Sequence, residues 1–108
     1  MLKIIAEDSG ARSGKLKTRH GTIETPFFMP IATKGTVKQL SPDEVKQIGS
    51  EAIIANAFIL YLKPGLDVIK KFKGIHKFMK WDGVLFTDSG GFQILSKSFL
   101  HKHNDNGV

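Results

Sequence analysis

The chain of 108 residues contains no cysteine, so disulfides, thiolate metal ligands and a catalytic thiol are excluded within it. It also lacks any apolar run near the roughly 20 residues that a membrane-spanning helix requires. Glu7 falls where a signal peptide would carry its apolar core, which argues against export. These absences favour a cytoplasmic protein that does not work at a membrane.

Acidic side chains are scarce as well. The chain has 16 Lys and Arg against 10 Asp and Glu, a formal net charge of +6. This excess favours an anionic partner, with nucleic acid ahead of a membrane surface. Hydrophobic residues make up 41% of the chain, a share typical of a folded globular domain. One domain fits this length.

Residues 1–24 predict a small antiparallel sheet. Ser9-Gly10 and Ser13-Gly14 separate short pieces in which polar and apolar residues alternate. Residues 25–31 then predict an apolar strand whose pairing is confined to its middle, because Pro26 and Pro30 bracket it.

Helices and strands alternate from residue 41 onward. Residues 41–44 (SPDE) have the composition of a capping box and predict a helix that Gly49 ends. Residues 52–55 and 84–87 are short, apolar segments, which predict strands buried within a sheet. Helical connections between strands favour parallel pairing, and therefore an α/β fold.

A second helix is predicted to begin at Pro64-Gly65. Its spacing places Leu66, Ile69 and Phe72 inward, and Gly74 ends it. A sheet of about three parallel strands leaves two open edges, although parallel sheets are normally covered. The chain therefore reads as the opening section of a larger α/β protein.

Polar residues follow the two predicted parallel strands at once. Asn56 follows the first strand and Asp88 the second. Ligands of parallel α/β folds bind at the carboxyl ends of the strands, so an amide and a carboxylate there can reach one small planar molecule. The alternative is that each residue only caps the next element.

Residues 88–93 (DSGGFQ) are the most informative segment. Gly90 and Gly91 let the backbone approach a ligand closely, Phe92 can stack on a base, and Asp88 can accept a proton. The alternative is a tight turn with Phe92 in the core. No Walker or dinucleotide-binding pattern accompanies the glycines.

Other polar residues give weaker signals. His76 lies among aromatic neighbours and is expected to pack there with a backbone hydrogen bond, and His101 and His103 are expected to be solvated. The lysines of residues 70–80 can meet phosphates, or simply form the solvated face of a helix.

Five segments resemble the tRNA-guanine transglycosylase family, in order along nearly the whole chain. They are residues 25–30 (TPFFMP), 35–38 (GTVK), 61–65 (YLKPG), 74–79 (GIHKFM) and 87–93 (TDSGGFQ). Family members exchange a guanine in tRNA for a 7-deazaguanine. The resemblance implies the N-terminal part of a (β/α)8 TIM barrel, with residues 1–24 as an antiparallel β cap and 25–108 as the first strands and helices.

The resemblance also implies roles for individual residues. Asp88 matches a catalytic aspartate that contacts the base and accepts a proton, and Phe92 matches the aromatic that stacks on the base. The remaining substrate-binding positions are Ser89, Gly90 and Gly91 in the loop and Ile31, Ile54 and Asn56 in the pocket wall. Residues 56–60 read NAFIL where many members have NTYHL, which leaves open which deazaguanine is inserted.

Further implications concern parts beyond this chain. The family's nucleophilic aspartate and its zinc, held by three Cys and one His, lie further along than residue 108, so no cofactor is expected in this chain and the fragment alone is expected to be inactive. Expected partners are tRNA, the deazaguanine base and a second subunit, in a homo- or heterodimer. Two other functions remain open: a non-catalytic tRNA-binding or partner subunit, and a small-molecule-binding module.

Overall fold

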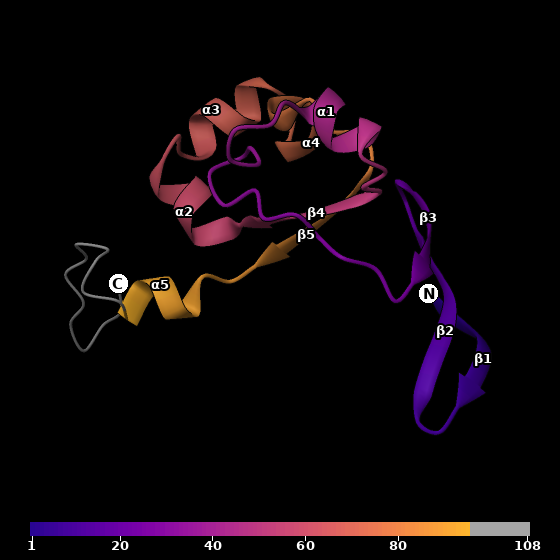
Figure 1. Ribbon diagram of the computed structural model, residues 1–108. Coiled ribbons are helices and arrows are strands. Elements are labelled where there is room, and N and C mark those ends of the chain that lie inside the picture. Colours follow the sequence, from indigo (N-terminus) through magenta and orange to yellow (C-terminus); the bar gives the residue numbers. More distant parts are fainter. Residues whose placement is uncertain (96–108) are drawn as a thin grey trace.

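The computed structural model describes residues 1–95 as an antiparallel sheet joined to an α/β body (Figure 1). The elements are β1 (Leu2–Asp8), β2 (Ala11–Thr18), β3 (Gly21–Thr25), α1 (Pro42–Gln47), β4 (Ala52–Asn56), α2 (Ala57–Leu62), α3 (Leu66–Lys71), α4 (Ile75–Met79), β5 (Val84–Asp88) and α5 (Gly91–Leu95). The predictions for His101 and His103 lie outside the described residues.

The first three strands form the antiparallel sheet that the sequence predicts, in the order β1-β2-β3. Ser9 and Gly10 form the first turn as expected, but the break expected at Ser13-Gly14 is wrong: both residues pair within β2, and the second turn lies at residues 19–20. This sheet, called the cap below, projects from one end of the body (Figure 1). Every residue of β1 is exposed, whereas Ile23 of β3 is buried against Ala52 and Val84. The cap therefore covers the body where β4 and β5 begin.

Strands β4 and β5 are parallel, as predicted, and pair from Ala52 opposite Val84 to Asn56 opposite Asp88. Helices α1 to α4 lie on one side of this pair (Figure 1). On that side Ile53 and Ala55 pack in a core with buried residues of three helices and the segment before β5, namely Val45, Leu60, Met79 and Trp81. The body is thus a layer of helices on a parallel strand pair, an α/β arrangement.

The segment between β3 and α1 corrects one prediction. Residues 25–31 were expected to pair through their middle, but their pairs lie at the two ends, where Thr25 closes β3 opposite Gly14 and Ile31 pairs in parallel with Ile54. Pro30 lacks an N–H but its carbonyl accepts from Ile54 N at 3.1 Å, and Ala32 N donates to Ile54 O at 2.7 Å. The segment between Pro26 and Pro30 therefore stays outside both sheets.

The parallel strands were also expected to be buried on both faces, and this is wrong. Ile54 and Phe86 are only half-buried, and Thr87 is exposed. Residues two apart share a face, and the face bearing Ile54 and Phe86 is opposite to the helices. In the part of the chain that the structure describes, this inner face is covered by the cap at one end and open at the other.

Helix α1 has the predicted start. Glu44 N donates to Ser41 Oγ at 3.2 Å, and the Glu44 carboxylate accepts from Ser41 N at 2.7 Å, which completes a capping box. Gly49 follows the end of the helix with φ of 85°, and its N–H donates to Lys46 O.

The segment after β4 differs from its prediction. Helix α2, which was not predicted, begins directly after Asn56 and buries Ile59 and Leu60. Helix α3 begins after Gly65 as expected, but Leu66 and Phe72 are each 50% exposed, so their inward placement is wrong. Because α2 already supplies the buried apolar residues, α3 lies further from the strands, with Ile69 packed against the core.

Candidate functional site

The carboxyl ends of β4 and β5 bring together the residues predicted to bind a base. Asn56 and Asp88 pair directly in register. Ile54 shares the inner face with Asn56, and Ile31 pairs with Ile54. The predicted pocket-wall residues therefore lie on the open inner face, at the end of the strands that is remote from the cap (Figure 1).

Asn56 is fixed in place by its own helix cap. Its side chain is buried, with the residue 2% exposed, and Oδ1 accepts from Ile59 N at 2.8 Å. This confirms capping as one role of Asn56. The other end of the amide, Nδ2, is buried without a hydrogen-bond partner among the described residues. A buried amide nitrogen without an acceptor is costly, so this donor is available to a neighbouring carboxylate or ligand.

Asp88 is the exposed member of the pair. Among residues 1–95 its carboxylate makes no ion pair and no side-chain hydrogen bond with another side chain. Its strand runs parallel to β4 and its side chain is not turned into the core, so the predicted arrangement of a strand-end carboxylate over an open face is present.

The loop after Asp88 requires glycine at position 90. Gly90 has φ of 73°, and a Cβ there would lie 2.6 Å from Phe58 Cβ and 2.8 Å from Asn56 Oδ1. Both distances are shorter than real side chains allow. The backbone of Gly90 can therefore lie directly against Asn56 and Phe58 only because glycine has no side chain. The loop position depends on this close approach.

Phe92 lies in the first turn of α5 and is 82% exposed. The alternative that it is a core residue is therefore wrong for the described chain. Ser89 and Gly91 are exposed beside it. An exposed aromatic ring four residues after the exposed carboxylate gives this end of the strands one flat surface and one proton acceptor.

One residue of the site was not predicted. Phe58 packs against Gly90 from α2, the helix that the sequence interpretation omitted. The signal was present, since Asn56 is a preferred N-cap residue and an apolar run of helix length comes directly after it.

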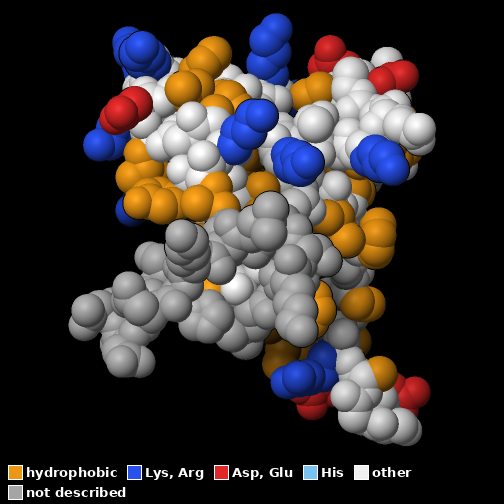
Figure 2. Space-filling view, turned by 90° about the vertical axis from the view of Figure 1, so that its left-hand side faces the viewer, with side chains coloured by type: hydrophobic (Ala, Val, Ile, Leu, Met, Phe, Trp, Pro, Cys, Tyr) orange, Lys and Arg blue, Asp and Glu red, His pale blue; other side chains and the backbone are white. Residues whose placement is uncertain are grey.

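The lysines of residues 70–80 are exposed, as both interpretations of them require. Figure 2 shows Lys and Arg side chains spread over the upper part of one face, above a band of hydrophobic side chains. The ion pairs of the described residues are Lys15 with Glu24 at 3.7 Å and Lys46 with Asp82 at 2.6 Å. The lysine run is therefore not neutralised by acidic neighbours in this part of the chain.

No group of three or more His, Asp or Glu side chains in residues 1–95 is arranged to hold a metal ion. With no cysteine in the sequence, the described part of the chain provides no ligand set for the zinc that the resemblance implies. Over the same residues, no helix is both long enough and apolar enough to cross a bilayer.

A cleft of about 480 Å³ lies at the other end of the strands, between the cap and the segments that lead into β4 and β5. Its walls include His20, Glu51 and Trp81, none of them predicted to bind the base. The base-binding candidates thus form an open surface rather than this cleft.

The described residues form an α/β fold with an antiparallel cap and a parallel strand pair, and an amide, a carboxylate and an exposed aromatic ring lie at or just after the strand ends. The family model for queuine tRNA-ribosyltransferase matches residues 7–108. The chain therefore belongs to this family, which confirms the resemblance found in the sequence.

Curated relatives agree with this assignment. A queuine tRNA-ribosyltransferase of Halalkalibacterium halodurans is 53% identical over 102 residues, which are 94% of this chain and 27% of the relative. One of Moorella thermoacetica is 52% identical over 100 residues, 93% of this chain and 27% of the relative. One of Staphylococcus aureus is 53% identical with the same coverage as the first. The chain thus spans about a quarter of the length of the curated relatives it matches.

Proposed function

We propose that the protein to which this chain belongs exchanges a guanine in tRNA for a 7-deazaguanine, and that this chain supplies the base-binding part. Membership of the queuine tRNA-ribosyltransferase family supports the reaction class. The observation that carries the role of this chain is the pairing of Asn56 with Asp88 at the open ends of β4 and β5.

The proposed reaction is a double displacement at the ribose C1′. An aspartate further along the protein attacks C1′, and the bond to guanine breaks, which leaves a covalent ribosyl-enzyme intermediate. The incoming base then forms the new bond through a ring nitrogen and displaces the aspartate. That nitrogen must lose its proton, and a second carboxylate beside the base can accept it.

Asp88 suits the second carboxylate because it is exposed and has no competing cation among the described residues. Asn56 holds an unpaired amide N–H next to it, which can orient the carboxylate or donate to the base. Phe92 offers a ring for stacking, and Ser89, Gly90 and Gly91 provide backbone without bulky side chains. Ile31 and Ile54 form the apolar wall.

The net charge of +6 supports a polyanionic substrate. A guanine within tRNA must leave its stack to reach such a surface. We include in the proposal a complete (β/α)8 barrel, a zinc site in the later part of the protein, a homo- or heterodimer, and action in the cytoplasm. On this view the 108-residue chain alone catalyses no exchange.

The test is an assay of labelled guanine incorporation into tRNA by the protein made from the complete reading frame. Asp88→Asn should lower the exchange rate about a hundredfold or more, because the amide cannot accept the proton. Asp43→Asn is the matched control, since Asp43 is an acidic residue of α1 at a distance from the strand ends, and it should leave exchange unchanged. Equal rates for Asp88→Asn and the parent would remove Asp88 from the reaction.

The same preparation distinguishes the other two functions. A protein that binds tRNA with strong salt dependence but exchanges no guanine is the non-catalytic tRNA-binding or partner subunit. Binding of a free base without salt-dependent tRNA affinity is the small-molecule module.

A further inference from the structure

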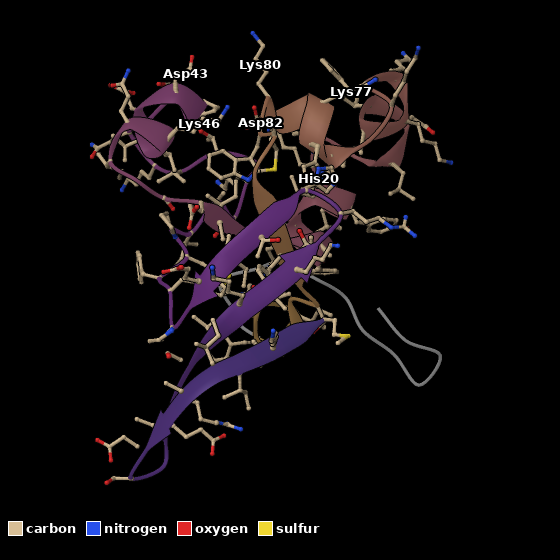
Figure 3. All side chains as sticks on the ribbon, turned by 90° about the vertical axis from the view of Figure 1, so that its right-hand side faces the viewer. His20, Asp43, Lys46, Lys77, Lys80 and Asp82 are labelled. Atoms are coloured by element: carbon tan, nitrogen blue, oxygen red, sulfur yellow. The ribbon has the colours of Figure 1, made fainter. Side chains whose placement is uncertain are left out.

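Two histidines from distant parts of the chain stack on each other where the cap meets the helices. His20 lies in the turn between β2 and β3, and His76 lies in α4. Their ring centroids are 3.7 Å apart and their planes differ by 11°. Figure 3 shows His20 at the tip of the β2–β3 hairpin, below the helical layer that carries Lys77 and Lys80.

The turn that presents His20 is itself ordered. Thr18 Oγ1 accepts from His20 N at 3.1 Å and donates to Gly21 O at 3.0 Å. These two bonds fix the turn locally, so the position of the imidazole depends on the hairpin as a unit. Contact with His76 then joins that unit to α4.

The surroundings of the stack are more positive than negative. A cleft of about 310 Å³ beside it is lined by His20, His76, Lys77, Lys80, Trp81 and Asp82. Lys77 and Lys80 come from α4 and its end, and Arg19 adjoins His20 in the hairpin turn. The acidic groups nearby are Asp82, which is paired with Lys46 of α1 at 2.6 Å, and Glu51, which shares the larger cleft with His20.

We propose that the His20–His76 stack is a pH-sensitive clasp that docks the cap turn onto α4 at neutral pH and releases it in mild acid. Two flat, neutral imidazoles can stack, but two imidazolium ions at this separation repel each other. The neighbouring lysines add to that repulsion, and of the two nearby carboxylates Asp82, which lines the cleft beside both rings, is already paired with Lys46.

Protonation of His76 is unfavourable in the docked state. Burial lowers the pKa of its imidazole below the ordinary value of 6.5, the charge of His20 lowers it further, and only a backbone hydrogen bond at Gly83 acts in the opposite direction. Its Nε2 is buried and without a partner in the described chain. The undocked state therefore binds more protons, so docking is complete above about pH 6.5 and weakens as the pH falls through the lowered value.

The test is amide hydrogen exchange of the 108-residue chain at a series of pH values, expressed as protection relative to an unfolded peptide. Each unit of pKa difference between docked and undocked His76 changes the docking equilibrium about tenfold. We expect protection of the turn amides of residues 19–23 to fall severalfold between about pH 7.5 and 5. Amides of β4 should keep theirs.

Two variants isolate the imidazoles. His76→Phe keeps an aromatic ring but cannot be protonated, so its turn protection should no longer depend on pH. His20→Phe removes only the charge of the partner and should raise the pKa of His76, read from imidazole ¹⁵N shifts, toward 6.5. His101→Gln/His103→Gln removes the other imidazoles of the chain and should retain the pH dependence.

Three outcomes would overturn the clasp. They are turn protection that does not change with pH, His76 titrating at or above 6.5 in the parent chain, and loss of β4 protection together with the turn. If His76→Phe does not fold, the His20→Phe titration and the parent series still decide the question.

Discussion

Asn56 and Asp88 stand opposite each other at the ends of two parallel strands, yet one is buried and the other exposed. The difference arises from the segment next to each strand end. Helix α2 begins directly after β4 and holds Asn56 Oδ1 through Ile59 N–H, and the loop after β5 places Gly90 against the same amide, whereas Asp88 precedes that loop and stays exposed. The site therefore combines a fixed amide with a carboxylate for which no side-chain hydrogen bond or ion pair is found in the described chain.

Loss of the Asn56 side chain should weaken the start of α2. Asn56→Ala leaves Ile59 N–H without its acceptor and should lower the free energy of unfolding by about 1 kcal/mol, measured by urea denaturation of the chain. Asn56→Ser is the control, because its hydroxyl can still accept from Ile59 N–H while the amide is gone. It should recover at least half of the loss, and equal destabilisation by both variants would show that the cap contributes nothing.

Substitution of the two adjacent glycines should have opposite effects. Gly90→Ala places a Cβ within 2.8 Å of both Phe58 and Asn56 at a positive φ, and should cost about 2 kcal/mol or more. Gly91→Ala meets only Ser89 Oγ at 3.8 Å and lies in α5, so it should be neutral or stabilise by up to about 1 kcal/mol. Thermal unfolding of both variants checks this. A neutral Gly90→Ala would contradict the close approach of Gly90 to Asn56 and Phe58, and a destabilised Gly91→Ala would contradict the open space beside Gly91.

The features that the sequence predicted correctly are those decided by near neighbours. The capping box of Ser41 and Glu44 depends on residues three apart, and the antiparallel cap depends on turns between adjacent strands. The placement of Asn56 and Asp88 at the same edge of the sheet was predictable, because helical crossovers favour parallel strands, but strand direction does not decide that the two strands are direct neighbours.

The features that the sequence missed depend on distant contacts. Whether Ile54 and Phe86 are buried depends on what covers the inner face, and no local pattern reports that. The outward position of Phe72 results from α2 having already filled the core. The stacking of His20 on His76 brings together two segments that are far apart in the sequence, and no local pattern in either segment predicts that contact.

The acid side of the stability profile should depend on two exposed carboxylates. Hydrogen bonds from the backbone and side chain of Ser41 lower the pKa of Glu44, and the hydrogen bond to Lys46 lowers that of Asp82. The unfolded chain therefore binds more protons, so each group contributes stability above its ordinary value, 4.5 for Glu44 and 3.8 for Asp82, that is lost as the pH falls through its lowered pKa. Urea midpoints measured from about pH 6 downward should show this loss.

Variants assign that loss to the two groups. Glu44→Gln and Asp82→Asn should each flatten part of the acid slope, and the double variant should flatten more than either alone. Asp43→Asn, which removes the other carboxylate of the first turn of α1, is the control and should keep the slope. A double variant with the parent's full slope would assign the acid sensitivity to other groups.

Substitutions of two apolar residues should distinguish a role in stability from a role in base binding. Val45 is 1% exposed in the helix-side core, whereas Ile31 is 66% exposed on the open inner face. In urea denaturation of the chain, Val45→Ala should cost about 2 kcal/mol and Ile31→Ala less than about 0.5 kcal/mol. In the guanine-exchange assay of the complete protein the order should reverse, because in the proposed site Ile31 contacts the base and Val45 does not. An Ile31→Ala variant that is as destabilised as Val45→Ala, or that exchanges guanine at the parent rate, would remove Ile31 from the pocket wall.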